Sequence, residues 1–441
     1  MGRGIRFIAQ CYEIETGTVL EESLLHDDHI SKASRLKELG YLHAEQIDLL
    51  KKIQDFKIKQ QMDLYTPTTC PECGFKIRRL GVFNSQFHAV LTDHKVSIQR
   101  VNCTCGWVSP TSVEGLYGSA IHPELLEKQV KQAGKESYEQ SSKSLDADSA
   151  MKRAVNGHSQ ISRAVKRVGE TLEEIKSSDG YGKVSAISDE LIVNIDGGHI
   201  KARGDSRSFE AMVAVVYRPE NLKYIDKNHN AISSKTIVCS AKDDGQETMN
   251  ALFTGACRVQ GMTPQTKITC LADGADNCWS IAHSIEKDCQ KITFVLDWFH
   301  VGMKFKNIPI PDEHAALYAK VKWHLWHGKP ETSLIRLEQL KQLIKDSSTI
   351  EKLNKLATYI RNNKEGIVNY GARKRAGLVY TSNLAESTVN TLINERQKGK
   401  QKMLWSRDGA HNILQIRASI ASNTWNNDWN IIEHKLYKEA A

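Results

Sequence analysis

Residues Glu190 to Arg203 read Glu-Leu-Ile-Val-Asn-Ile-Asp-Gly-Gly-His-Ile-Lys-Ala-Arg. The short run of apolar and β-branched residues predicts a buried strand that ends on Asp196 and is followed by two glycines. An ionised carboxylate at the end of a buried strand is costly unless a positive group lies beside it. Gly197 and Gly198 would allow a ligand or another backbone to come close. Taken alone, Asp196 could equally begin a turn between two hairpin strands.

Two strands further along the chain also end on aspartate. The elements predicted after Asp196 are two strands, a helix, a strand, a helix and a strand, over residues 209–217, 236–240, 246–259, 267–272, 279–288 and 292–296. The last two strands end on Asp273 and Asp297. The order β-β-β-α-β-α-β is that of the ribonuclease H-like α/β fold, in which the first and fourth strands are neighbours. Asp196 and Asp273 are therefore expected to meet at one edge of the sheet.

Length and composition describe an ordinary globular protein with a mild basic excess. A chain of 441 residues is long enough for two or three domains. The net charge of +8 is compatible with a polyanionic partner. No apolar run approaches the length of a membrane span, and the N-terminus lacks a charged segment followed by an apolar core. The sequence therefore predicts a cytoplasmic protein that is not associated with a membrane.

Four of the ten cysteines form two close pairs, Cys70-Pro-Glu-Cys73 and Cys103-Thr-Cys105, each followed by glycine. The residues between them alternate enough over 82–101 for two strands, so the pattern predicts a zinc ribbon that binds Zn²⁺. Reduced free thiols are the alternative. Because a site closed by four thiolates has no open position for a substrate, its role would be in folding and DNA docking.

The first 64 residues are predicted to be a helical region that opens with a possible strand over 5–13. Apolar residues recur at helical spacing at Leu36, Leu39, Leu42, Ile47, Leu50 and Ile53. Such a helix could pack on its own domain or form a dimer contact.

Residues 122–175 show helical periodicity with many basic residues. The pattern is interrupted at Asn156-Gly157 and restarts at Ser159, as in a helix-turn-helix whose second helix enters the DNA major groove. Helical pairs joined by a glycine turn also occur in proteins that do not bind DNA. On the helix-turn-helix interpretation, the DNA-binding residues are Arg163, Lys166 and Arg167.

An all-helical segment, residues 312–380, precedes a third candidate acidic residue. Glu386 begins a further predicted helix, which is followed by the most densely basic stretch of the chain. Carboxylates from two strand ends and a helix, Asp196, Asp273 and Glu386, are suitable ligands for two Mg²⁺ or Mn²⁺ ions that act on a phosphodiester. The nearby basic residues would hold DNA phosphates and are Arg396, Lys398, Lys400 and Lys402.

These motifs resemble the DDE transposases of prokaryotic insertion sequences, close to the Mutator-like group. The resemblance covers about residues 65–425. It rests on Asp196-Gly-Gly, Leu271-Ala-Asp273-Gly-Ala, Asp297-Trp-Phe-His300 (the Asp/Cys-x-x-His element), Leu384-Ala-Glu386-Ser, Glu395-Arg-Gln-Lys, Met403-Leu-Trp405 and Asp408-Gly-Ala. The individual motifs are short, but their order and spacing together are specific.

The resemblance implies metal-dependent cleavage of transposon ends and strand transfer into target DNA. It assigns Asp196, Asp273 and Glu386 as the metal-binding catalytic triad, and Asp297 and His300 as supporting residues. Asp297 competes with Asp273 as second ligand, whereas Asp276 is expected to be a helix cap. The implied partners are double-stranded DNA of the terminal repeats and the target, and further copies of the chain in a dimer or larger synaptic complex. A nuclease without strand transfer and an inactive DNA-binding regulator are the competing functions.

The predicted organisation has six parts. They are an N-terminal helical region (1–64), the zinc ribbon (65–112), a helical DNA-binding region (113–180), the first part of a ribonuclease H-like core (181–311), an all-helical insertion (312–380), and the second part of the core with basic C-terminal helices (381–441). A protein of this kind is expected to associate with the nucleoid.

Overall fold

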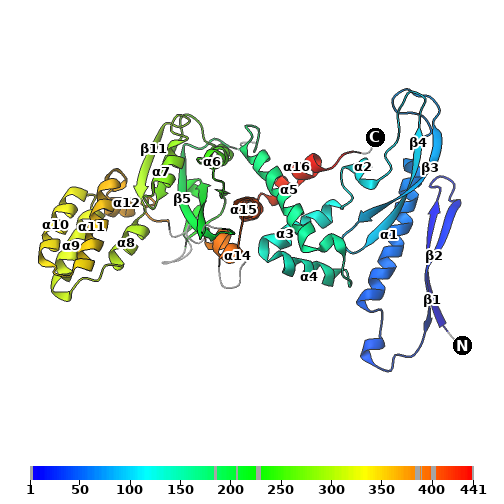
Figure 1. Cartoon of the computed structure of the whole chain (residues 1–441), viewed down its shortest axis with the longest axis horizontal. Coiled ribbons are helices and arrows are strands. Elements are labelled where there is room, and N and C mark those ends of the chain that lie inside the picture. The colour runs from blue at the N-terminus through cyan, green and yellow to red at the C-terminus, as the bar shows by residue number, and fades with distance from the viewer. Residues whose placement is uncertain are drawn as a thin grey trace. The chain divides into compact units, whose positions relative to one another are not determined.

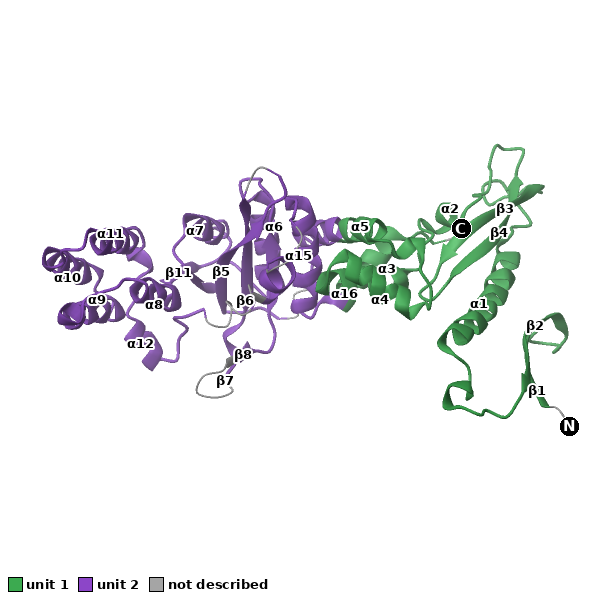
Figure 2. Ribbon diagram, turned by 60° about the horizontal axis from the view of Figure 1, so that its bottom comes forward, with its two compact units in different colours: residues 1–168, 426–441 green, residues 169–425 purple. Residues whose placement is uncertain are grey.

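The computed structural model describes residues 3–182, 186–204, 207–224, 230–382, 388, 390–398 and 404–439. The chain forms two compact units (Figures 1 and 2). Unit 1 contains Met1–Val168 and Asn426–Ala441, and unit 2 contains Gly169–Trp425. Together they give a mixed α/β structure that includes a mixed β-sheet.

Unit 1 contains two β-hairpins and a set of helices. Its elements are β1 Arg3–Tyr12, β2 Val19–Ile30, a 3₁₀ turn Leu36–Glu38, α1 His43–Tyr65, β3 Arg78–His88, β4 Asp93–Asn102, α2 Val113–Tyr117, α3 Pro123–Lys135, α4 Tyr138–Asp148, a 3₁₀ turn Ala154–Asn156, α5 His158–Ser177 and α16 Trp425–Leu436. Helix α5 continues into unit 2, and α16 begins at its boundary.

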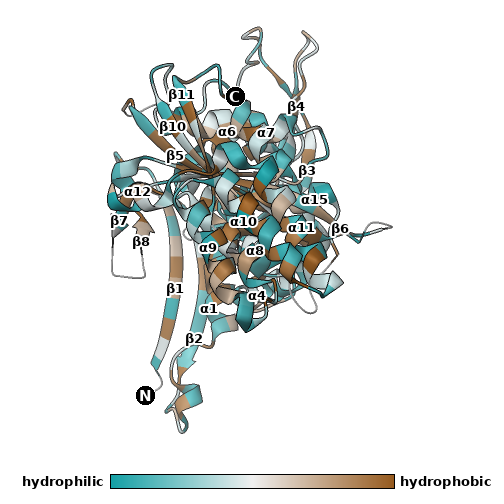
Figure 3. Ribbon diagram, turned by 90° about the vertical axis from the view of Figure 1, so that its left-hand side faces the viewer, coloured by the Kyte–Doolittle hydropathy of each residue, from teal (hydrophilic) through white to brown (hydrophobic). Residues whose placement is uncertain are grey.

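The predicted N-terminal region is helical only in its second half, where α1 forms. The possible strand over residues 5–13 is confirmed as β1, whereas β2 was not predicted. Residues 3–30 form the antiparallel hairpin β1–β2, in which apolar residues recur along β1 (Figure 3). The pairing register shifts twice, so that Leu20 and Leu25 are extra residues in β2. These bulges disturb the alternation of side chains that reveals a strand in a sequence. Of the six apolar residues predicted at helical spacing, Ile47 is buried on α1.

The two strands predicted between the cysteine pairs are confirmed as β3 and β4. Their inner face packs with α1 and α2 around Val96, Ile98, Val113 and Leu116. The turn between the strands is held by Arg153, whose buried guanidinium donates to the backbone oxygens of Ala89, Val90 and Thr92 at 2.8–3.0 Å. Arg153 also contacts Asp93 at 2.5 Å. Because a buried cation needs such partners, Arg153 fixes the hairpin to the helical part of unit 1.

Helices α3, α4 and α5 account for the predicted helical region. Ser137 caps α4 by accepting a hydrogen bond from the Gln140 amide. The helix predicted to restart near Ser159 begins at His158. Residues 149–157 separate α4 from α5, a longer connection than the roughly three- or four-residue turn of a simple helix-turn-helix.

Unit 2 is built on a five-stranded sheet. Helices α6 and α7 lie between its strands in the sequence, and further helices follow its last strand. Its elements are β5 Glu190–Lys201, β6 Ser208–Tyr217, β7 Leu222–Tyr224, β8 Asn230–Ile232, β9 Thr236–Ser240, α6 Glu247–Val259, β10 Lys267–Ala272, α7 Asp276–His283, β11 Lys291–Leu296, α8 Trp298–Lys306, α9 Ala315–Trp326, α10 Pro330–Leu343, α11 Ser347–Asn362, α12 Tyr370–Arg375, α14 Glu395–Gln397 and α15 Arg407–Ala421. Short 3₁₀ turns cover 219–221, 312–314 and 364–366, and a π-helical turn covers 390–394.

The sheet has the strand order β11-β10-β5-β6-β9. The first three predicted strands are confirmed as β5, β6 and β9, which pair antiparallel in that order, and β10 and β11 run parallel to β5. The prediction that the first and fourth strands are neighbours is confirmed, because β5 pairs with β10. One face of these strands packs against α6 and α7 in a continuous apolar cluster that includes Val193, Phe253 and Ile281. This packing fixes the carboxyl ends of β5, β10 and β11.

The predicted helical segment over 312–380 contains α9, α10, α11 and α12. Val321, Leu325, Leu337, Leu353 and Ile360 form its buried positions. Trp323 and Leu343 on the same helices are exposed. The buried Tyr370 hydroxyl donates to the Leu296 carbonyl at 2.8 Å, which ties the segment to the end of β11.

A buried polar network joins α5, α15 and the end of β9. His411 Nδ1 accepts the Ala241 amide at 3.3 Å, so Nε2 carries the proton and lies 3.1 Å from Glu173 Oε2. Lys242 also pairs with Glu173. The contact with His411, aided by Lys242 and opposed by burial, lowers the pKa of Glu173 to about 2.

Glu173→Gln is expected to destabilise the chain at neutral pH and to have little effect at pH 2. The folded carboxyl has a pKa below its ordinary value of 4.5, so its contribution is present above pH 4.5 and is lost as the pH falls towards 2. The shift corresponds to on the order of 2–3 kcal/mol. Denaturant unfolding of both proteins between pH 7 and pH 2 measures this difference, and an equal difference at both ends would contradict the network.

Candidate functional site

The three predicted aspartates lie at the same register position of adjacent parallel strands. Asp273 and Asp297 directly follow β10 and β11, but β5 continues to Lys201, so the prediction that this strand ends on Asp196 is wrong: Asp196 is paired with Val213 of β6. Ile195 is the register partner of Ala272, which in turn pairs with Leu296. Asp196, Asp273 and Asp297 are the next residues on the three strands. Because paired strands lie about 4.8 Å apart, Asp273 stands between the other two aspartates.

Asp297 is the most completely engaged of the three carboxylates. Its side chain is buried and caps α8 by accepting the Phe299 amide at 3.0 Å. Ser382 donates both its amide, at 2.9 Å, and its hydroxyl to this carboxylate. Burial raises the pKa of Asp297, but His300 and Ser382 outweigh that effect and hold the pKa below its ordinary value. Asp297 is therefore held as a charged anchor.

His300 lies one helical turn after Asp297, with Nδ1 3.1 Å from the Asp297 Oδ2. Burial lowers the pKa of His300, but Asp297, together with Asp196 and Asp273, raises it above the ordinary value. The imidazole lies beside these carboxylates and, when protonated, supplies the positive group that the sequence analysis required.

Asp196 and Asp273 have simpler surroundings. Asp196 accepts its neighbouring Gly197 amide at 2.8 Å, and Asp273 accepts the Ala275 amide at 2.9 Å. Burial raises the pKa of Asp196, and the charges of Asp273 and Asp297 raise it further, against the effects of Gly197 and His300. This repulsion between carboxylates is what a bound divalent cation would relieve.

The close approach predicted at the two glycines is made by a side chain. A Cβ on Gly197 would overlap the carboxylate of Glu210 on β6. Glu210 Oε2 accepts a hydrogen bond from Asn277 Nδ2 at 2.6 Å, so its position is fixed by α7. Asp276 is the first residue of α7 and not its cap, because Ala275 occupies the N-cap position and donates to Asp273.

Several residues that contact this site were not identified from the sequence. Besides Ser382, the Tyr359 hydroxyl donates to the Asp273 backbone oxygen at 2.7 Å. The buried Cys278 thiol has a pKa raised by burial and by Asp273 and Asp196. These contacts join residues far apart in the chain, and no local pattern marks them.

The third proposed ligand, Glu386, lies outside the described residues, as do Lys400 and Lys402. Lys398 is described and follows α14. Arg396 is 1% exposed, and its guanidinium carbon lies 4.9 Å from the centre of the buried Trp405 ring. The prediction that Arg396 contacts DNA is therefore corrected: this side chain is part of the core of unit 2.

The other predicted DNA-binding residues lie on one exposed face of α5. Arg163, Lys166 and Arg167 are exposed, whereas Ile161, Val165 and Val168 on the opposite face are buried. Arg163 donates to Gln160 Oε1 at 3.3 Å, and Arg167 donates to the Leu436 oxygen at 3.0 Å. Exposure on one helix face is compatible with phosphate contacts.

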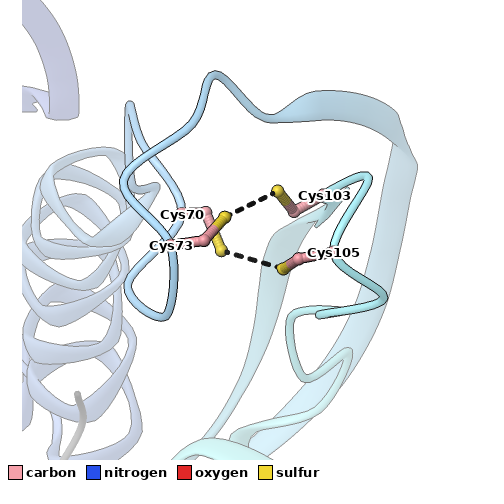
Figure 4. Close-up of side chains that lie close together, drawn as sticks. All are labelled: Cys70, Cys73, Cys103 and Cys105. Atoms are coloured by element: carbon pink, nitrogen blue, oxygen red, sulfur yellow. Dashed lines mark hydrogen bonds between the residues drawn. The ribbon is translucent and has the colours of Figure 1, made fainter.

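The four predicted metal-binding cysteines come together in unit 1 (Figure 4). Their sulfur atoms all lie within 4.8 Å of one another. Cys70 Sγ is 3.7 Å from Cys105 Sγ, and Cys73 Sγ is 3.4 Å from Cys103 Sγ. Gly74 and Gly106 adopt φ values of 73° and 99°, which confirms that glycine is needed in each knuckle turn. The cluster could bind a metal ion.

Comparison with curated proteins found no match. Among the described helices, none has both the length and the apolar character that crossing a membrane requires. One family model matches residues 118–434, which include both the helices α3 to α5 and the strand-end aspartates. The match extends over more than half of the chain, so this protein belongs to the uncharacterised protein family UPF0236.

Proposed function

We propose that this protein is a DDE transposase with a ribonuclease H-like core, which cleaves transposon ends and transfers the resulting strands to target DNA. The observation that carries the proposal is the common register position of Asp196, Asp273 and Asp297 on adjacent parallel strands, where β10 and β11 end and β5 continues. The strand order of the sheet, with the first strand between the second and the fourth, supports the ribonuclease H-like assignment.

Asp196, Asp273 and Glu386 are the proposed ligands of two Mg²⁺ or Mn²⁺ ions. The fit rests on two carboxylates at neighbouring register positions. Burial raises the pKa of Asp196, and the nearby charge of Asp273 raises it further. When bound, such ions polarise the scissile phosphodiester and activate the attacking oxygen. Asp273 is preferred over Asp297 as second ligand, because Asp297 is already occupied by Ser382, Phe299 and His300.

The remaining residues of the site position the reacting groups. Asp297 orients His300, and the imidazole lies among the carboxylates, which favour its protonated form; there it can hold a phosphate oxygen or a water molecule. Water attack at the element end leaves a 3′ hydroxyl, and this hydroxyl attacks target DNA in the second reaction. No covalent link to the protein is needed.

The cysteine cluster is proposed to hold one structural Zn²⁺. Zinc–thiolate bonds of about 2.3 Å in a tetrahedron place the sulfur atoms about 3.8 Å apart. The measured separations of 3.7 and 3.4 Å are close to this value. The ion would stabilise the two knuckles and the hairpin that joins them.

The proposed partners are double-stranded DNA of the element ends and the target, and at least a second copy of the chain for synapsis. The net charge of +8 and the basic face of α5 support a DNA partner. The proposed location is the cytoplasm, in association with the nucleoid.

The test is incubation of the purified chain with DNA that carries the element's own terminal repeats, with and without Mg²⁺ or Mn²⁺. A transposase is expected to cut at the repeat ends and to yield joined strand-transfer products. Cleavage without joined products would favour the nuclease alternative. Binding of the ends without metal-dependent cleavage would favour the inactive regulator.

Arg163→Ala and Lys166→Ala are each expected to weaken binding to the element ends. Loss of one phosphate contact reduces the salt dependence of binding by a slope of about 1, whatever the DNA sequence. Lys143→Ala is the matched control, because Lys143 is also exposed but lies on α4 and not on the proposed recognition helix. The measurement is the binding constant of each variant across a series of salt concentrations. If the slope of its logarithm against the logarithm of the salt concentration is unchanged in both variants, α5 does not contact the DNA phosphates.

A further inference from the structure

Strand β1 has an open edge with little of the usual protection against pairing, since Arg3 and Arg6 in its first half are its charged residues. Within the described residues its sheet contains two strands, so β1 has β2 on one side only. Its ten residues, Arg-Gly-Ile-Arg-Phe-Ile-Ala-Gln-Cys-Tyr, include no proline, no lysine and no acidic residue. Natural proteins place such residues, or bulges, on exposed edges to prevent association.

The partner strand β2 carries those protective features. Both register shifts insert their extra residue, Leu20 or Leu25, into β2, so β1 stays regular. Strand β2 contains four acidic residues, and one of them, Glu21, is held to α1 by Lys59 and by Gln60 at 2.7 Å. The β2 edge of the hairpin is therefore protected against pairing by bulges and acidic residues, whereas the β1 edge has neither.

Apolar side chains on both faces of β1 are also exposed. Ile8 is 49% exposed and Tyr12 is 58% exposed, and Ile5 is exposed as well. A two-stranded hairpin by itself is only marginally stable, so extension of the sheet and cover for these side chains would both stabilise it.

We propose that β1 is a dimerisation strand, which pairs antiparallel with β1 of a second copy to form a continuous four-stranded sheet. This inference does not depend on the proposed function, because it concerns the chain without DNA.

Charge and symmetry indicate that the partner of β1 is the same strand of a second copy. A closed two-fold dimer must pair β1 with β1 or β2 with β2. Pairing of β2 with β2 would bring eight acidic residues together, since each strand has four. In β1 the basic residues Arg3 and Arg6 lie in the first half, and Glu13 and Glu15 follow its end. Antiparallel pairing therefore places the basic half of each copy towards the acidic end of the other, although Arg6 also pairs with Asp27 of its own hairpin at 2.9 Å.

The test compares Ile8→Lys with Leu24→Lys in the full chain. Ile8 and Leu24 are register partners on the exposed hairpin, so the two substitutions place the same charge at equivalent positions of β1 and β2. Sedimentation equilibrium over a range of concentrations gives the dimer dissociation constant, and circular dichroism checks that each variant is folded.

Wild type and Leu24→Lys are expected to be dimers, whereas Ile8→Lys should raise the dissociation constant about tenfold or more, because the charge enters the paired edge in both copies. Equal loss of dimer in both variants would indicate face-to-face packing and overturn the proposal. A monomeric wild type, or a mass that grows beyond the dimer with concentration, would overturn it too.

Discussion

Asp273→Asn is expected to reduce cleavage of the element ends by about a thousandfold or more, while the protein stays folded and still binds DNA. A metal ligand contributes several kcal/mol to stabilisation of the transition state, and each 1.4 kcal/mol corresponds to about a factor of ten in rate. Asparagine keeps the shape of the side chain and its acceptor for the Ala275 amide. Cleavage rates of wild type and variant at several Mg²⁺ concentrations measure the effect.

Asp297→Asn is the informative comparison, because the structure gives Asp297 a different role. Its carboxylate accepts two hydrogen bonds from Ser382 and one from Phe299, and it holds His300. This variant is expected to lose thermal stability as well as activity, whereas Asp273→Asn loses activity alone. If Asp297→Asn abolished cleavage without loss of stability and Asp273→Asn remained active, the second metal ligand would be Asp297.

Cys70→Ser is expected to remove the metal ion from unit 1 and to unfold the two knuckles. Metal analysis of the wild-type chain should give one zinc ion per chain, and the variant should contain none. The free energy of unfolding should fall by on the order of 5 kcal/mol, since structural zinc supplies roughly 10–16 kcal/mol in small zinc-dependent domains. The loss should extend to the β3–β4 hairpin, because both knuckles flank it.

Cys11→Ser is the matched control for this experiment. Cys11 lies in the same unit but is not a member of the cysteine cluster. Its substitution should leave metal content and stability nearly unchanged. Wild-type protein without stoichiometric metal, together with an unchanged stability of Cys70→Ser, would show that the cluster consists of free thiols.

Elements and sites could be predicted from the sequence where the residues of one short segment are enough to determine its structure. Apolar β-branched runs give buried strands, so β5, β10 and β11 could be located by pattern, as could the aspartates that follow β10 and β11. The end of β5 was placed too early, at Asp196, because its continuation to Lys201 depends on pairing with β6. The cysteine knuckles were equally clear, because ligand spacing and the glycine after each pair are local properties. Strand β2 was missed for a local reason too, since its two bulges remove the period-two signal.

What the sequence by itself determined is therefore the set of elements and the residue types at their ends. Only the tertiary structure decided how those residues are used. Asp297 is saturated by Ser382, 85 residues further along the chain, and Arg396 is buried against Trp405 instead of being presented to DNA. The open edge of β1 became visible only when β2 had been placed beside it. Such roles depend on which distant segments pack together. The packing decides which side chains are buried and which charges lie beside them, and neither can be read from the neighbouring residues in the sequence.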